Sequence, residues 1–250
     1  MPAAGKTRRG GTRSGPAGDR IRGAALALAV TLALLTGIIR GFAGSGALFL
    51  AEMRRLAPPE RTGLPEAEYP GMAAHIADYL AGRKDSFQYS VSGEGGESLP
   101  CFHEYEIAHM RDCRGLIRLD GLVCAACLAA VLWTAGSLRL RLRKAGQDAR
   151  ERRRAAARGA GYALLGLSLI AAAMLLWAVI DFDGLFITFH RVAFTNELWL
   201  LNPRTDLLIR LMPEAMFVDL GVKGLGLFAA GMAAFICAGA ALAGKQRRDG

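Results

Sequence analysis

The sequence predicts an all-α membrane protein with four transmembrane helices, a small extracytoplasmic α/β cap and an interfacial segment before the last helix. Of its 250 residues, 52% are hydrophobic, and the mean hydropathy is positive. Four apolar runs are long enough to cross the hydrocarbon core at a rise of 1.5 Å per residue. Basic residues are concentrated in alternate connections between these runs. The composition excludes a disordered chain and a simple soluble domain.

The distribution of charge predicts the topology. Lys and Arg number six in the N-terminal arm and nine in residues 139–158, whereas residues 52–120 have 8 basic and 12 acidic side chains and residues 181–219 have 3 and 6. Basic connections stay in the cytoplasm, so both termini and the middle loop are expected there. The chain then divides into a disordered basic arm (1–22), transmembrane helices (23–40, 120–138, 159–180 and 219–243), an extracytoplasmic cap (41–119), a cytoplasmic loop (139–158), an interfacial catalytic segment (181–218) and a cytoplasmic tail (244–250). We therefore expect a multi-pass membrane protein whose cap and interfacial segment lie at the outer leaflet.

The cap is expected to contain both helix and strand. Met72–Leu80 has apolar residues at helical spacing, and Asp85–Ser92 alternates like a half-exposed strand before a glycine-rich turn. Glu104–Leu119 has the pattern of a helix that runs into the second span. His75, within the first of these helices, is expected on the surface of the cap.

Two histidines stand out as candidates for chemistry. His190 lies in an aromatic segment that also contains Arg, Asn, Glu and Asp, and polar groups at membrane depth are expensive and indicate function. His109 has Glu106 and Asp112 three residues away on either side, on one helical face. A carboxylate beside an imidazole can fix its tautomer and raise its basicity. Both histidines are predicted on the same side of the membrane, and His103 has a weaker case.

Two motifs resemble the lipoprotein intramolecular transacylase family, Lit, of four-helix membrane proteins in Gram-positive bacteria. They are the run Glu104–Asp112 (E-Y-E-I-A-H-M-R-D) and the longer pattern Phe189–Glu214 (F-H-x3-F-x-N-x2-W-x-L-x-P-x2-D-x-L-I-x3-P-E). The likeness runs from the first span to the last. Two departures from the family pattern are Cys113 in place of an aliphatic residue and Asn202 in place of Asp.

The resemblance implies a membrane acyltransferase of the bacterial cell membrane, without a cofactor and with its active site at the outer leaflet. Such an enzyme moves the sn-2 acyl chain of a diacylglyceryl lipoprotein to the α-amine of its N-terminal cysteine, which gives a lyso-form lipoprotein. Its expected partners are diacylated bacterial lipoproteins and membrane lipids. We assign catalysis to His109 and His190 with exchangeable roles, support to Glu106, Asp112, Asn196 and Asp206, and substrate binding to Phe189, Phe194, Trp199, Arg191 and Arg204. The arginines could instead form structural ion pairs.

Several alternatives remain at this point. Cys101 and Cys113 could form a disulfide, or one of them could carry the acyl group as a nucleophile beside a histidine. The outer histidines and carboxylates could form a divalent-metal site, structural or in a transporter, although no compact ligand spacing is present. A scaffold without chemistry is a third possibility. Nucleic-acid binding is disfavoured because no base-reading module accompanies the basic runs.

Overall fold

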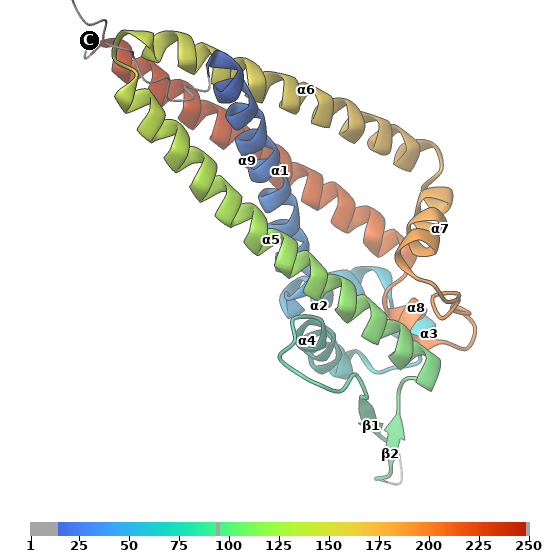
Figure 1. The fold of residues 1–250 in the computed structure, drawn as a ribbon. Coiled ribbons are helices and arrows are strands. Elements are labelled where there is room, and N and C mark those ends of the chain that lie inside the picture. Colours follow the sequence, from blue (N-terminus) through green and yellow to red (C-terminus); the bar gives the residue numbers. More distant parts are fainter. Residues whose placement is uncertain (1–14, 94–95, 249–250) are drawn as a thin grey trace, which may run out of the picture. The chain divides into compact units, whose positions relative to one another are not determined.

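The computed structural model describes residues 15–93 and 96–248, the side chains of 241–248 excepted, and its elements are shown in order in Figure 1. The helices are α1 (Pro16–Ala43), α2 (Gly46–Leu56), α3 (Pro59–Thr62), η1 (Glu66–Glu68), α4 (Tyr69–Leu80), α5 (Glu104–Lys144), η2 (Gly146–Asp148), α6 (Ala149–Ile180), α7 (Phe182–Ala193), α8 (Leu207–Leu211) and α9 (Glu214–Arg248). The strands are β1 (Ser90–Ser92) and β2 (Ser98–Pro100), which pair antiparallel. Within these ranges four helices, α1, α5, α6 and α9, contain segments long and apolar enough to cross a membrane. The predicted all-α membrane fold is therefore confirmed.

The described residues form two units, and the first contains residues 15–30 and 127–173. In this unit α1 crosses α6 at close range. The approach is close enough that a side chain at Gly23 would clash with the carbonyl of Ala156, and one at Gly159 with the carbonyl of Arg20. Small residues that allow backbones to approach in this way are the usual basis of helix packing in membranes.

Part of the arm that we predicted to be disordered is helical. Residues 16–22 form the first turns of α1, and the part of the prediction that concerns residues 1–14 lies outside the described residues. Asp19 explains the difference: it lies in the first turn, where an acidic side chain interacts favourably with the helix dipole, and it is fully buried. Its carboxylate pairs with Arg152 at 3.1 Å, Arg141 at 3.7 Å and Arg22 at 3.9 Å.

The prediction of a loop over residues 139–158 was wrong. Helix α5 continues to Lys144, η2 covers residues 146–148, and α6 begins at Ala149. The basic side chains that marked this stretch as a connection are good helix formers, and cations in the last turn of α5 complement the negative end of its dipole.

The second unit contains residues 31–126 and 174–248 apart from the undescribed pair 94–95. Its core lies in the cap, where α2 packs against α4. The large buried side chains are apolar or aromatic and come from both helices and from the following segment: Phe49, Met53, Tyr69, Met72, Ile76, Tyr79 and Phe87. The cap therefore has the hydrophobic core that a small domain needs for its own stability.

Two details of the cap differ from prediction. The expected strand Asp85–Ser92 is regular only at Ser90–Ser92, because Phe87 turns into the core and stacks on Phe102 with ring centroids 4.6 Å apart. His75 is buried rather than on the surface, and its Nε2 lies 3.0 Å from the carbonyl oxygen of Phe87. Burial lowers the pKa of His75, so this histidine is a neutral core residue near neutral pH.

Small residues also position α9 against the second half of α1. A side chain at Gly231 would collide with Leu34, and Gly224 faces Phe42 and Ile38. Near the start of α9, Lys223 pairs with the fully buried Glu52 of α2 and with Asp219. The last helix is thus attached to the cap by an ion-pair cluster.

Helices α5 and α7 supply the histidines, and the prediction that the Glu104 helix runs into the second span is confirmed. The Glu104 helix and the second span are one continuous element of 41 residues. The segment 181–218 is largely helical: it contains α7, α8 and the start of α9. On α7, Phe189 and Val192 are 54% and 83% exposed, so one face of this short helix is apolar and uncovered within the unit.

Candidate active site

His190 lies on α7 with one ring nitrogen engaged and the other free to act. Its Nδ1 is 2.7 Å from the carbonyl oxygen of Phe186, one turn earlier. A carbonyl only accepts, so Nδ1 carries the hydrogen and Nε2 holds the lone pair of the neutral imidazole. Burial lowers the pKa of His190, although the bond to Phe186 partly opposes this shift. The side chain is therefore a neutral potential base at pH 7.

His109 faces His190 from α5, and their ring centroids are 6.1 Å apart. His109 is 7% exposed, and its Nε2 lies 3.5 Å from the Sγ of Cys113, which is one turn later on the same helix. Its Nδ1 is buried and has no hydrogen-bond partner among the described residues. Buried polar atoms are usually paired, and an unpaired one suggests a role with substrate.

Aromatic rings enclose both imidazoles. Phe194 lies 5.2 Å from the His109 ring and 5.5 Å from the His190 ring. Phe186 and Trp199 contact His190 with centroids 4.2 Å and 5.1 Å away. Phe189, which is half exposed, meets His190 edge-on at 5.3 Å. The two histidines therefore share an apolar environment. In such an environment the charged form of a side chain costs free energy, and hydrogen bonds are stronger than in water.

The sequence had suggested that Asp112 hydrogen-bonds to His109, but the structure shows another partner. Its Oδ2 accepts from the side-chain amide of Asn196 at 2.9 Å. Asn196 in turn accepts from the backbone N–H of Leu198 with its Oδ1, and its carbonyl accepts from the Trp199 indole. Asp112 thus fixes the loop after α7 and, through Asn196, the Trp199 ring on His190. One of the two N–H groups of the Asn196 amide is used in this bond, and through it Asn196 acts as a positioning group in this structure.

Glu106 also differs from its predicted role of orienting His109. It is fully buried, and its two oxygens accept backbone N–H bonds of 2.8 Å, one from His103 and one from Leu208. His103 immediately precedes α5, so the first bond is one half of a capping box. The second satisfies an unpaired N–H at the start of α8. One carboxylate therefore joins the beginnings of two helices.

Replacing Glu106 by alanine is expected to lower the free energy of unfolding by about 2–6 kcal/mol, because two buried N–H groups lose their acceptor. Denaturation of the purified protein in detergent measures the change. Glu104→Ala, which removes the same charge from an exposed position two residues earlier, is the matched control. Equal stability of the two variants would show that the Glu106 bonds do not hold α8 to α5.

Asp206 supports the same junction and lies in a separate hydrogen-bond cluster. It accepts from Tyr105 at 2.7 Å, from Thr205 at 2.6 Å and from the backbone of Asn202 at 2.7 Å. Burial alone would raise its pKa, but these hydrogen bonds outweigh it and the pKa is lowered. Asp206 is therefore an ionised carboxylate that shapes the turn before α8.

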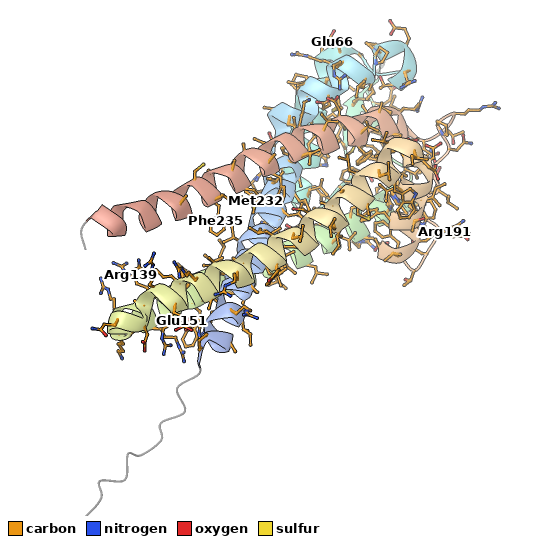
Figure 2. The ribbon with its side chains drawn as sticks, turned by 90° about the horizontal axis from the view of Figure 1, so that it is seen from above. Glu66, Arg139, Glu151, Arg191, Met232 and Phe235 are labelled. Atoms are coloured by element: carbon orange, nitrogen blue, oxygen red, sulfur yellow. The ribbon has the colours of Figure 1, made fainter. Side chains whose placement is uncertain are left out.

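The remaining predicted residues are peripheral or unpaired. Arg191 and Arg204 are exposed, and within the described ranges neither side chain has a hydrogen-bond or ion-pair partner; Arg191 lies at the margin of α7 in Figure 2. The ion pairs considered for them with nearby carboxylates do not form. Arg210 instead donates to the backbone oxygens of Asp206 and Thr205.

The structure also bears on the disulfide and metal-site alternatives. Cys101 and Cys113 are both free, because the Cys113 side chain turns to His109 while Cys101 continues from the β hairpin. Across the described residues, no three His, Cys, Asp or Glu side chains lie together in a way that could hold a metal ion.

Sequence comparison decides the family. The model of the lipoprotein intramolecular transacylase Lit family matches residues 24–217, which is most of the chain. The chain belongs to the Lit family. It is therefore a membrane acyltransferase, and the name of the Lit family implies a lipoprotein substrate.

Solved structures of Lit from Bacillus cereus have the same fold. The match to one of them spans 92% of this chain and 98% of the Bacillus cereus chain, with a TM-score of 0.69 and 16% sequence identity. Two variants with a substituted histidine, to arginine and to alanine, give TM-scores of 0.68 and 0.66 at 16% identity, with 93% and 92% of this chain covered and 95% and 96% of theirs. No curated protein matches the chain. The neighbours were determined as membrane-integral proteins, in agreement with the four apolar helices.

Sequence analysis missed two contributors to the candidate site and left open which cysteine lies beside a histidine. The backbone carbonyl of Phe186 holds His190, the Cys113 thiol contacts His109, and the Tyr105 hydroxyl supports Asp206. The first two were detectable, because each lies four residues from its histidine and such pairs meet on a helix. No sequence signal linked Tyr105 to Asp206, since 101 residues separate them.

Proposed function

We propose that this Lit family member transfers the sn-2 acyl chain of a diacylglyceryl lipoprotein to the α-amine of the same N-terminal cysteine. The observation that carries the proposal is the pair of buried imidazoles 6.1 Å apart, each with one ring nitrogen that has no hydrogen-bond partner in the described part of the chain. An O-to-N acyl transfer needs two such groups: a base for the attacking amine and a donor for the oxygen of the ester. The product is an N-acyl-S-monoacylglyceryl cysteine, the lyso-form.

The tautomers divide these tasks between the two histidines. His190 presents the Nε2 lone pair and accepts a proton from the amine as its nitrogen attacks the ester carbonyl carbon. The carbon–oxygen bond to the glyceryl unit then breaks. The same proton passes from His190 to the departing oxygen, which becomes the free sn-2 hydroxyl. Atoms and charge balance without any external reactant, as an intramolecular transfer requires.

His109 acts as the donor in this scheme, with Cys113 as its positioning residue. An imidazole nitrogen accepts a hydrogen bond more strongly than a thiol sulfur does, so we assign the 3.5 Å contact as S–H donating to Nε2. The hydrogen of His109 then sits on Nδ1, which is buried and unpartnered. That N–H is placed to stabilise the tetrahedral oxyanion, where a pre-oriented donor is most effective.

The surrounding rings favour transfer over hydrolysis. Phe194 and Trp199 pack against the imidazoles and exclude water from one side of the reaction. Because amine and ester belong to the same molecule, holding them in contact supplies several kcal/mol of the rate enhancement. The exposed apolar side chains of α7, Phe189 and Val192, fit a position against the acyl chains of the substrate and the surrounding lipid.

The proposed site faces the extracytoplasmic leaflet. Its support is the charge distribution: the basic residues of the arm and of 139–158 belong on the cytoplasmic side, and the acidic segments that carry His109 and His190 belong opposite. Mature lipoproteins are anchored by their lipidated cysteine in that outer leaflet of the cell membrane, so substrate and site would share one interface.

The proposal is tested by incubating the purified full-length protein with a synthetic diacylglyceryl lipopeptide and analysing the products by mass spectrometry. We expect a product of unchanged mass whose fragments place one acyl group on the amine. A lipopeptide with an acetylated amine should remain unchanged. Release of free fatty acid without an N-acyl product would indicate hydrolysis and contradict the proposal.

Cys113 distinguishes direct transfer from an acyl-enzyme route. If the thiol only donates a hydrogen bond, Cys113→Ala should lower the transfer rate by about fivefold, the equivalent of one weak hydrogen bond, while Cys113→Ser retains a donor and most activity. Single-turnover rates measure this difference. Inactivity of both variants, together with an acylated protein in wild-type reactions, would instead make Cys113 the nucleophile.

A further inference from the structure

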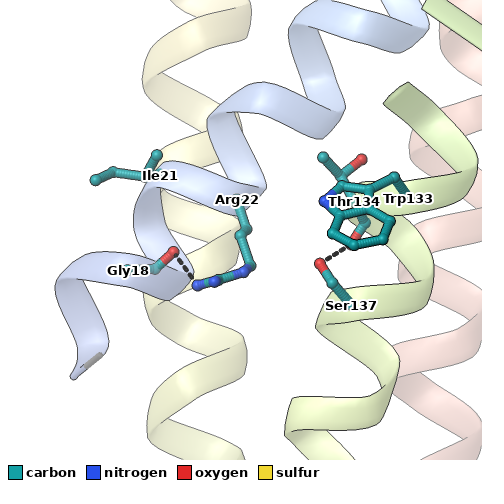
Figure 3. A pocket seen from close by; sticks show the side chains of 6 residues that line it. All are labelled: Gly18, Ile21, Arg22, Trp133, Thr134 and Ser137. Atoms are coloured by element: carbon teal, nitrogen blue, oxygen red, sulfur yellow. Dashed lines mark hydrogen bonds between the residues drawn. The ribbon is translucent and has the colours of Figure 1, made fainter. Parts of the chain in front are cut away.

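A groove in the first unit lies far along the chain from the histidines and has no part in the proposed transfer. It lies between the start of α1 and the second half of α5 and has a volume of about 320 Å³ (Figure 3). That volume is within the range of small-ligand sites. Its lining consists of Gly18, Ile21, Arg22, Trp133, Thr134 and Ser137.

The packing of α1 explains why the groove is open. One face of α1 lies directly on α6, where Gly23 and Gly159 leave no space between the backbones. Of the residues that line the groove, Ile21 of α1 is 70% exposed and Trp133 of α5 is 78% exposed. The groove therefore has an apolar wall that the described protein leaves uncovered.

The polar end of the groove is cationic. Arg22 lines it and donates to the carbonyl of Gly18 at 2.9 Å, which holds the guanidinium in place and leaves its other N–H groups available (Figure 3). Behind it, the buried Asp19 also pairs with Arg141 and Arg152, so one carboxylate faces three guanidinium groups and the cluster is positive. The hydroxyls of Thr134 and Ser137 donate to carbonyls of their own helix and can only accept from a ligand.

We propose that this groove binds one anionic glycerophospholipid, with its phosphate at Arg22 and an acyl chain along Trp133. A cationic end beside an exposed aromatic wall matches both parts of such a lipid, and basic pockets between membrane helices are known to recognise anionic head groups. With the orientation proposed above, the site lies in the cytoplasmic leaflet. The binding itself does not depend on that orientation or on the catalytic proposal.

The test is retention of added lipid by the purified full-length protein, measured by native mass spectrometry. Phosphatidylglycerol and phosphatidylcholine with identical acyl chains are titrated separately, and we expect stoichiometric retention of the first at concentrations where the second dissociates. Arg22→Gln should weaken phosphatidylglycerol binding by about fivefold, as expected for the loss of one cation near a lipid phosphate. Soluble glycerol 3-phosphate should not displace the lipid, because it lacks the chain that the apolar wall holds.

Two variants separate the groove from general surface charge and from misfolding. Arg154→Gln removes the same charge from an exposed site on α6, away from the groove, and should change binding less than twofold. Trp133→Ala removes the apolar wall without changing charge and should also weaken binding. Equal effects of Arg22→Gln and Arg154→Gln, or equal retention of the two lipids, would overturn the proposal.

Discussion

Replacing His190 by alanine is expected to lower the rate of lyso-lipoprotein formation by about 10²–10⁴-fold, the usual contribution of a general base. The substitution removes the Nε2 lone pair that is free because Nδ1 is bound to the carbonyl of Phe186. Single-turnover conversion of a diacylglyceryl lipopeptide, followed by mass spectrometry, measures the effect directly. Binding of the lipopeptide should change little, since the proton is transferred only during attack of the amine.

His103→Ala provides the control for this change. His103 is exposed, stacks on Tyr105 with ring centroids 5.3 Å apart, and takes part in the Glu106 bond only through its backbone. Its loss should leave the rate within a few-fold of wild type. A His190→Ala protein that keeps its fold and wild-type turnover would remove His190 from the reaction.

Replacing His109 by alanine is expected to reduce turnover by about 10²–10³-fold, the range measured when one oxyanion donor is removed. The affected atom is Nδ1, the buried nitrogen for which the described residues provide no hydrogen-bond partner. His109→Gln offers an amide N–H in its place and cannot serve as a base near neutral pH. Under our assignment, His109→Gln should therefore recover part of the activity that His109→Ala loses.

The corresponding pair at His190 should behave differently. Glutamine there supplies no base, so His190→Gln is expected to be as inactive as His190→Ala. Steady-state rates of the four variants, with thermal stability measured for each, reveal the division of labour. If glutamine rescues position 190 but not position 109, the two roles are exchanged.

The amino-acid sequence predicts the membrane architecture because hydropathy and charge act over whole segments. Four apolar runs and the alternation of basic connections are sufficient for the four long helices. The ends of these helices were harder to predict, because arginine has a high helix propensity and is also common in solvent-exposed connections. Residues 139–144 and 149–158 extend α5 and α6 for this reason, although their charge had suggested a loop.

For the candidate site, the sequence indicated which residues lie near one another but not which hydrogen bonds they form. The i,i+3 spacing placed Glu106 and Asp112 beside His109 on one helix, yet each carboxylate bonds to a group from another element. Leu208 and Asn196 reach them from 102 and 84 residues away. Helical spacing describes neighbours within a helix and contains no information on which buried N–H needs an acceptor.

The most direct test of the central claim is a crossover experiment with two lipopeptides. One carries a heavy isotope in its sn-2 chain and the other in its peptide, and both are converted together by the purified full-length protein. Direct transfer between the two imidazoles predicts that the heavy sn-2 chain appears only on the amine of its own light peptide, and that the heavy peptide receives only a light chain. Products that combine the heavy chain with the heavy peptide, or an amine that carries the sn-1 chain, would contradict the account.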